Sequence, residues 1–413
     1  MMLEYFNNVV TGIQKRINSE PHKTNARKKY ALEISKLGSR LYSDSGEKKI
    51  AWCGFLAPFD ILNAMGVTSC FVEFIGAMLA STGMADTYIN DAEQDGYAID
   101  SCAYHRSVVG AIKKNVMPVP DFIIGTSCPC VAGLGVIENM ARIYKKDLFV
   151  LNVPQENTVE SVKYLSLQYR KMVEFVSAQI GNPLDEDKLR EAMDLTNKAR
   201  ALLIEVYDLA KKLPSPANSI ILKDYGIVLN LLMGTQNAVD VAKACRDEFI
   251  NKIEEGMPGL PEEKIRLLWV QSRIQFRFPI EKILAEKFSA NIVIDELNNI
   301  FWDPIDLDDP YTSIARNTLA NPFAVNIPKR VSLLQDLAKE YKIDGAINPC
   351  NWGCRQGAGA RGLISNGLKK VNVPVLNLEV DCVDSRNFAE GQIMTRLEAF
   401  MEMLDNKPNP FIS

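Results

Sequence analysis

The sequence has few histidines, little net charge and no long apolar run. Two of its 413 residues are histidine, and 47 lysines and arginines nearly balance 51 aspartates and glutamates, leaving a formal net charge of −4. No apolar run approaches the roughly 18 residues that would cross a bilayer, and the N-terminus lacks the charged-then-apolar pattern of a signal peptide. No basic stripe with interleaved aromatic residues occurs. We therefore expect a cytoplasmic protein with no membrane and no nucleic-acid partner.

The sequence also lacks a phosphate-binding loop of the GxxxxGK[ST] type. Its nearest match, Gly362–Lys369, has leucine in place of the lysine, so any ATP hydrolysis would belong to another protein. Gly357–Gly362 does match the dinucleotide pattern GxGxxG, with Glu379 and Asp381 about 20 residues further on. Residues 351–356, however, separate these glycines from the preceding expected strand. We expect the glycines to lie within a helix, which makes NAD binding the weaker interpretation.

Two stretches of the chain alternate apolar runs with helical segments. Strands are expected at 49–54, 67–74, 121–125, 147–153, 267–271, 291–296, 344–348 and 373–378, and helices at 58–66 and 279–288. Such alternation predicts right-handed crossovers and parallel sheets. Tryptophan, proline and acidic residues recur in the same order in both stretches. The predicted fold class is α/β, with two similar doubly wound parallel-sheet domains.

The length and the change in periodicity predict four segments. Single cores rarely exceed about 250–300 residues, so 413 residues should form more than one domain. We expect an N-terminal helical segment over 1–45, a first α/β domain over 46–155, a helical connector over 156–260 and a second α/β domain over 261–413. Open parallel sheets bind ligands outside the carboxyl ends of their strands. If those ends face each other, a site is expected between the two domains.

Nine cysteines are present, and clustered cysteines in a reducing compartment are more often metal ligands than disulfides. Cys70 and Cys245 lie among apolar residues and are interpreted as core, whereas Cys53, at a strand end, could be core or could line the site. The other six lie just past expected strand ends or at a helix start, where free N–H groups favour a thiolate. These six candidate ligands are Cys102, Cys128, Cys130, Cys350, Cys354 and Cys382.

Six thiolates exceed the four ligands that one zinc ion or one cubane takes. They suit two cubane clusters with three protein ligands each. We therefore predict an iron–sulfur site. A zinc ion held by four of the six cysteines, with two bystanders, is the alternative, although the CxC and CxxxC spacings differ from the CxxC pairs of structural zinc.

From about Trp52 to Leu404 the chain resembles the 2-hydroxyacyl-CoA dehydratase and benzoyl-CoA reductase family. The matching stretches are Ile99-Asp-Ser-Cys-Ala-Tyr, the strand and turn ending at Cys130, Asn351-Trp-Gly-Cys-Arg, and Asp381-Cys-Val-Asp-Ser-Arg-Asn-Phe. The resemblance implies that the three cluster cysteines of the dehydratases correspond to Cys102, Cys130 and Cys354. This chain adds Cys128, Cys350 and Cys382.

The added cysteines make the chain similar to the family's double-cubane cluster proteins, in which two cubanes share a bridging sulfide as an [8Fe-9S] unit. That resemblance implies a homodimer that takes low-potential electrons from a separate ATP-hydrolysing iron–sulfur activator and reduces small unsaturated molecules such as acetylene. The alternative is a subunit of a 2-hydroxyacyl-CoA dehydratase with a single [4Fe-4S] cluster and a partner subunit of different sequence. A non-catalytic electron carrier or maturation scaffold is the third hypothesis.

Glu73 and His105 are the candidate catalytic residues. Glu73 aligns with a dehydratase active-site glutamate, whereas Phe55 takes the place of a serine near the acyl-CoA, a departure that favours the double-cubane branch. His105 follows Cys102 by three residues and could donate a proton or a hydrogen bond to sulfide. Alternatively, Glu73 caps a helix or pairs with an arginine, and His105 is a surface or packing residue. Three arginines are expected to offset cluster charge: Arg106, Arg355 and Arg386.

Overall fold

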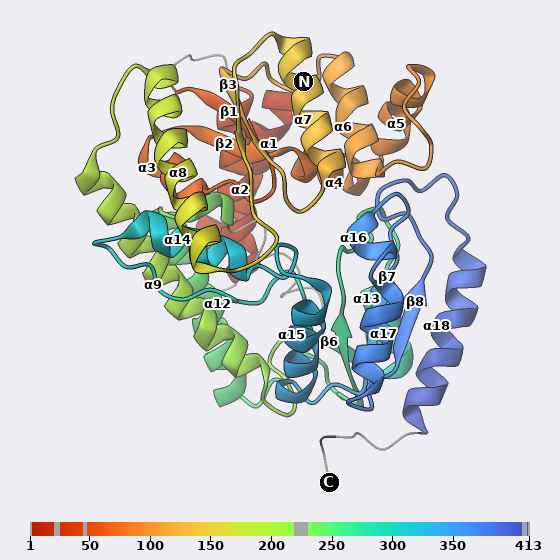
Figure 1. Cartoon of the computed structure of the whole chain (residues 1–413). Coiled ribbons are helices and arrows are strands. Elements are labelled where there is room, and N and C mark those ends of the chain that lie inside the picture. Colours follow the sequence, from red (N-terminus) through yellow and green to blue (C-terminus); the bar gives the residue numbers. More distant parts are fainter. Residues whose placement is uncertain (1, 20–24, 44–47, 219–229, 407–410, 412–413) are drawn as a thin grey trace.

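Two four-stranded parallel sheets with the same strand order form the framework of the chain (Figure 1). The computed structural model describes residues 2–19, 25–43, 48–218, 230–406 and 411. All neighbouring strands in both sheets are parallel. The predicted α/β class with two similar parallel-sheet units is confirmed.

The first sheet has the order β2-β1-β3-β4 and is formed by β1 (Ile50–Cys53), β2 (Thr68–Phe71), β3 (Phe122–Thr126) and β4 (Leu148–Leu151). The helices between and after these strands are α3 (Phe59–Ala64), α4 (Val72–Ser81), α5 (Ala85–Gln94), α6 (Ala103–Lys113) and α7 (Val131–Tyr144). Trp52 of the central strand β1 is fully buried, and Cys70 and Ile123 flank it. Every residue of β2 and β3 is buried, as is typical of a parallel sheet covered on both faces.

The second sheet repeats this plan in the order β6-β5-β7-β8. Its strands are β5 (Ile265–Trp269), β6 (Ala290–Asp295), β7 (Gly345–Pro349) and β8 (Val375–Leu378). The helices between and after these strands are α13 (Ile280–Phe288), α14 (Pro310–Ala320), α15 (Ile327–Glu340), α16 (Arg355–Ala358), α17 (Arg361–Lys369) and α18 (Glu390–Asp405). Of these, α14 packs against α8 (Val159–Ile180) and joins the core of the first sheet. Trp269 of β5 is fully buried between Asp295 and Ile347, the position that Trp52 holds in the first sheet.

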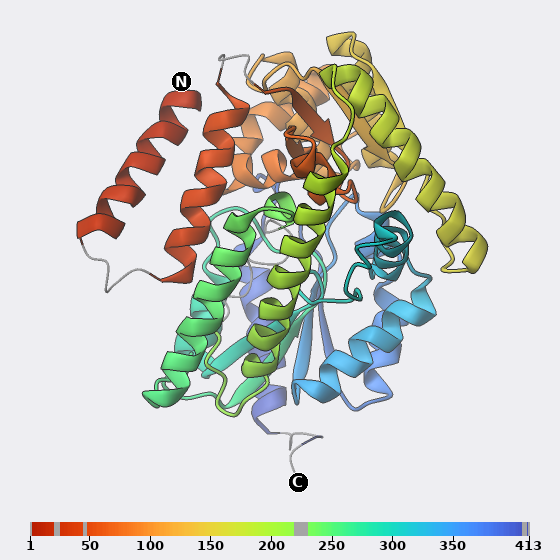
Figure 2. The same cartoon turned by 90° about the vertical axis from the view of Figure 1, so that its left-hand side faces the viewer.

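Helices outside the two sheets together contribute residues to the apolar cores of both. They are α1 (Met2–Ser19), α2 (Ala26–Leu41), α8 (Val159–Ile180), α9 (Glu186–Ala210), the 3-10 turn η2 (Asn230–Leu232) and α12 (Gln236–Glu254). The long helices α9 and α12 lie side by side, and α1 lies outermost beside α2 (Figure 2). Residues of α2, α9 and α12 share one apolar core with the second sheet. Across the described residues, no helix has the length and apolar character needed to span a membrane.

Two elements differ from, or refine, what the sequence predicts. The strand expected over 67–74 ends at Phe71, and Glu73 lies in the first turn of α4 instead of on a strand. A carboxylate is stabilised there by the N-terminal end of the helix. The glycines of the dinucleotide-like pattern lie largely within helices, as predicted, with Gly357 in α16 and Gly362 in α17.

Candidate functional site

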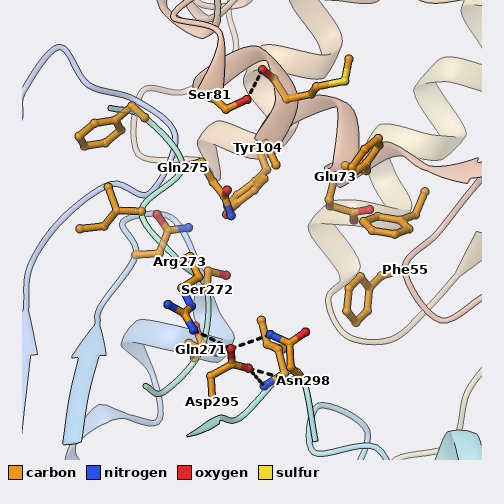
Figure 3. A pocket seen from close by; sticks show the side chains of 18 of the residues that line it. Phe55, Glu73, Ser81, Tyr104, Gln271, Ser272, Arg273, Gln275, Asp295 and Asn298 are labelled. Carbon is orange, nitrogen blue, oxygen red and sulfur yellow. Dashed lines mark hydrogen bonds and ion pairs between the residues drawn. The ribbon is translucent and has the colours of Figure 1, made fainter. Parts of the chain in front are cut away.

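A cavity of about 1000 Å³ lies where the loops that follow the strands of both sheets meet. Residues after β2, β3, β5, β6 and β7 line it, so it lies at the carboxyl ends of both sheets, where such folds bind ligands. Figure 3 shows Glu73 and Phe55 on one side of this cavity and Arg273, Asp295 and Asn298 on the other.

Three of the six predicted cysteine ligands line the cavity, and each is the N-cap of a helix. Cys102 precedes α6, Cys130 precedes α7 and Cys354 precedes α16. The Cys130 sulfur accepts a hydrogen bond from the Gly133 N–H at 3.3 Å, and the Cys354 sulfur accepts one from the Gly357 N–H at 3.4 Å. These donors favour a thiolate or a sulfide, because the N-terminal N–H groups of a helix are otherwise unpaired.

The pKa values of the cavity thiols reflect two opposed effects. Burial raises the pKa of Cys130 to about 11, and the Gly133 N–H opposes this rise. Burial likewise raises the pKa of Cys102 and of Cys354. Binding to a metal would supply the charge that keeps such buried thiols deprotonated.

The other three predicted ligands are buried beside this group. The Cys128 thiol donates to the Phe323 carbonyl at 3.1 Å. Cys350 directly follows β7 and lies close to Asn377, with its sulfur 3.6 Å from the Asn377 side-chain oxygen. The Cys382 N–H donates to the Asn351 side chain at 2.7 Å, which ties the turn after β8 to the turn after β7.

Electrostatic coupling shows which thiols are neighbours. Beyond the larger effect of burial, Cys130 raises the pKa of Cys128, and Cys354 raises that of Cys130. Burial raises the pKa of Cys382 most, and the charge of Asp381 raises it next. The thiols of Cys354, Cys102 and Cys350 also raise it. Contacts between the turns agree with this, so the six cysteines lie in one group of adjoining turns. The other three lie apart from it, since Cys53 and Cys70 neighbour each other in the first sheet and Cys245 is buried in α12.

The six thiols are not gathered around one point in the described part of the chain. In the described part of the chain, no group of three or more His, Cys, Asp and Glu side chains is placed to hold one metal ion. A single zinc ion needs its thiolates about 2.3 Å away, all around one point. The ligands of a cubane bind different iron atoms and so lie further apart. Free thiols, helix N-termini and mutual proximity thus suit iron–sulfur ligation.

The two candidate catalytic residues contact each other beside Cys130. His105 Nε2 lies 3.4 Å from Glu73 Oε1, and His105 is buried. A Cβ added at Gly133 would lie 3.2 Å from His105 Nε2 and 3.4 Å from the Cys130 sulfur. Gly133, His105 and Cys130 are therefore neighbours. Glu73 Oε2 and His105 Nδ1 are buried without a hydrogen-bond partner among the described residues. The pair therefore places a carboxylate and an imidazole side by side at the edge of the cavity.

The opposite side of the cavity is polar, and sequence reasoning missed it. Arg273 Nη2 and Asn298 Nδ2 donate to the Asp295 carboxylate at 2.9 and 2.6 Å. Gln275 Nε2 donates to the Tyr104 hydroxyl at 3.1 Å. The segment 271–275 follows β5 and Asp295 ends β6, so the rule that located the cysteines, polar residues just past strand ends, would also have found them.

The arginines expected to offset cluster charge are paired elsewhere or exposed. Buried Arg106 forms ion pairs with Glu93, Asp381 and Asp384, and Arg386 pairs with two of the same carboxylates, Glu93 and Asp384. Arg355 is exposed. Burial raises the pKa of Cys354, and the N–H groups of Gly357 and Gln356 and then the charge of Arg330 oppose this rise. Arg330 lies in α15, and its place beside the site was not predicted.

Comparison with known proteins gives consistent matches along most of the chain. A family model described as 2-hydroxyglutaryl-CoA dehydratase, D-component, matches residues 55–404. The (R)-phenyllactyl-CoA dehydratase alpha subunit of Clostridium sporogenes is 23% identical, covering 91% of this chain and 95% of that protein. A benzoyl-CoA reductase subunit of Thauera aromatica is 27% identical, with 84% and 85% covered, and the lactoyl-CoA dehydratase subunit alpha of Anaerotignum propionicum is 24% identical, with 86% and 90% covered. These matches agree with the resemblance inferred from the sequence motifs.

Proposed function

The chain belongs to the family of the 2-hydroxyglutaryl-CoA dehydratase D-component, and from that premise we propose that it is an iron–sulfur reductase carrying a double-cubane [8Fe-9S] cluster. It takes low-potential electrons from a separate ATP-hydrolysing iron–sulfur activator and reduces a small unsaturated molecule of the acetylene type. Its relatives are subunits of dehydratases and of a benzoyl-CoA reductase, which supports an enzyme. We also propose a homodimer in the cytoplasm, since nine free cysteines suit a reducing compartment.

One continuous group of six thiols supports the double cubane. Cys102, Cys130 and Cys354 face the cavity, and Cys382 couples them to Cys350, while Cys128 adjoins Cys130. Six thiolates divide naturally into three for each of two cubanes. The cluster, when bound, supplies low-potential one-electron transfer, and its potential follows net charge, hydrogen bonds to sulfur and solvent exposure.

The residues around the cluster would deliver protons and exclude water. Glu73 and His105 lie 3.4 Å apart beside Cys130, where they would pass a proton to a substrate that gains electrons. Phe55, Phe71 and Phe74 line the same side of the cavity. Their rings make this side apolar, which limits proton delivery from bulk water and favours delivery through the carboxylate–imidazole pair.

A second candidate function is favoured by the size of the cavity and by the cysteines that reach it. About 1000 Å³ is much more space than a two-carbon substrate fills, and only three of the six thiols are among the described lining residues. This function is that of a 2-hydroxyacyl-CoA dehydratase with a second, different subunit. A single [4Fe-4S] cluster would bind to Cys102, Cys130 and Cys354, and the large cavity would hold the acyl-CoA substrate. The names of the relatives also favour it.

Iron and acid-labile sulfide per chain of anaerobically purified protein distinguish these functions. About eight iron atoms and about nine sulfides support the double cubane, whereas about four of each support the dehydratase-type site. Zinc in place of iron would overturn both. Protein with about eight iron atoms is then supplied with an ATP-dependent donor and acetylene. If the cluster is reduced but no added unsaturated compound is turned over, the protein is an electron carrier and the reductase proposal fails.

A further inference from the structure

Arg330 is a fully buried arginine whose contacts reach the cysteine turns of both sheets. Its exposed fraction is 0%, and it lies in the first half of α15. Its Nε and Nη2 donate to the two carboxylate oxygens of Glu296 at 2.6 and 2.7 Å, a two-pronged ion pair. Glu296 follows β6 and is itself 1% exposed.

Two further contacts of Arg330 lead to the proposed ligands. Its Nη1 donates to the Gln356 carbonyl at 3.0 Å, and the Gln356 side chain in turn donates to the Pro129 carbonyl at 2.9 Å. Gln356 lies two residues after Cys354, and Pro129 lies between Cys128 and Cys130. Arg330 thus fixes a residue that joins the turn after β7 to the turn after β3.

The guanidinium group also packs on the loop that contacts Cys128. Its central carbon lies 4.8 Å from the centre of the Phe323 ring, and the Phe323 carbonyl accepts the Cys128 thiol at 3.1 Å. The Glu296 carboxylate accepts a hydrogen bond from the Gln271 N–H at 3.1 Å. The Gln271 side chain packs so closely on Gly357 that a Cβ added there would lie 2.5 Å from the Gln271 side-chain oxygen. Both members of the ion pair therefore support the walls of the cysteine site.

We propose that Arg330 and Glu296 act with opposite sign on the reduction potential of the cluster held by these cysteines, so that their pairing keeps either charge from shifting it, and that Arg330 also positions the Cys354 and Cys128 turns. This inference rests on the proposed iron–sulfur function. A cluster gains one negative charge when it accepts an electron from an added reductant. A buried cation next to it favours the reduced state and a buried anion disfavours it, because charges interact strongly where water is excluded. In the native pair the two charges largely cancel.

Charge variants separate this electrostatic role from a purely structural one. Glu296→Gln leaves the Arg330 charge unbalanced and should raise the midpoint potential. Arg330→Gln removes the cation and should lower the potential, and the double variant, with no charge on either residue, should return close to the wild-type value. A unit charge roughly 10 Å away at an effective dielectric constant of about 20 changes such an equilibrium about tenfold. For a one-electron couple this is about 59 mV.

The measurement is a redox titration of the holoprotein with titanium(III) citrate, followed by electron paramagnetic resonance, with iron counted in every variant. The matched control is Glu263→Gln, which breaks a pair of similarly buried residues, Arg266–Glu263, beside the amino end of β5. That variant should lose stability and keep its potential. Equal shifts in the control and in Glu296→Gln, or a Glu296→Gln potential that stays or falls, would overturn the inference while leaving the proposed function intact.

A comparison of Arg330→Lys with Arg330→Gln covers the case in which Glu296→Gln does not fold. Both lose the two-pronged geometry, but only the lysine variant keeps the charge. The potential of Arg330→Gln should therefore lie below that of Arg330→Lys, and equal potentials would refute the electrostatic role. Absence of iron from the wild-type protein would instead remove the proposed function, and with it this inference.

Discussion

Replacing Cys382 by alanine gives a direct test of the six-ligand site. Cys382 is fully buried, 0% exposed, and its thiol is coupled to those of Cys354, Cys102 and Cys350. If it ligates one of two cubanes, that cubane is left with two protein ligands and should be lost. We expect iron to fall from about eight atoms per chain to about four. The same result is expected for Cys350→Ala and Cys128→Ala.

Destabilisation of the fold should not account for this loss of iron. Truncating one buried side chain by a single sulfur atom costs about 1–3 kcal/mol, whereas a folded protein has about 5–15 kcal/mol of stability in reserve. The variants should therefore fold. Cys245→Ala is the matched control, because Cys245 is also 0% exposed but lies in α12, apart from the six-cysteine group.

Iron and sulfide are assayed on anaerobically purified variants, alongside a thermal unfolding curve for each. Full iron in Cys128→Ala, Cys350→Ala and Cys382→Ala would refute the double cubane. If Cys102→Ala lost its iron in the same experiment, a single cubane on the three cavity cysteines would be the correct description.

Three further predictions concern protons, packing and pH. Glu73→Gln keeps the shape of the side chain but removes its ability to take up and release a proton, so the rate of substrate reduction should fall about 100-fold while iron content stays unchanged. Gly353→Ala places a Cβ 2.5 Å from the Ser101 carbonyl carbon at a φ of +71°, which should displace the Cys102 turn and lower iron content. Burial raises the pKa of Asp60 from 3.8 to about 6, so the folded protein binds more protons than the unfolded chain between these values, and its stability falls as the pH rises through them. Asp60→Asn removes this effect and should stabilise the protein by at most about 3 kcal/mol at pH 8, with no gain below about pH 4.

Each of these three has its own control and contrary result. Full activity of Glu73→Gln would leave the glutamate with a packing role only. The control for the glycine variant is Gly181→Ala, because Gly181 has a similar φ of +76° and nothing lies within 4 Å of the added Cβ. This control should keep its iron. Equal iron loss in both glycine variants would show that backbone strain, not the contact with Ser101, is the cause. Denaturant unfolding at several pH values tests Asp60→Asn, and a gain that does not vary between pH 4 and pH 8 would contradict the titration.

The sequence by itself determined the fold class and the neighbourhood of the site. Apolar runs alternating with helices specify parallel sheets, and the carboxyl ends of parallel strands meet at one edge whatever residues follow them. Cysteines after β3, β7 and β8 and at the start of α6 were therefore expected to converge, and the structure brings their turns together.

Only the tertiary structure decided which charges and protons act at that site. Arg106 and Arg386 lie close to predicted ligands in sequence but are paired with carboxylates, whereas Arg330 reaches the site from α15. Glu73 meets His105 because α4 begins at Val72, a boundary that the apolar run does not reveal. The physical reason is that strand order depends on local patterns, while side-chain partners depend on how segments far apart in the chain pack. Burial then sets how strongly each charge acts.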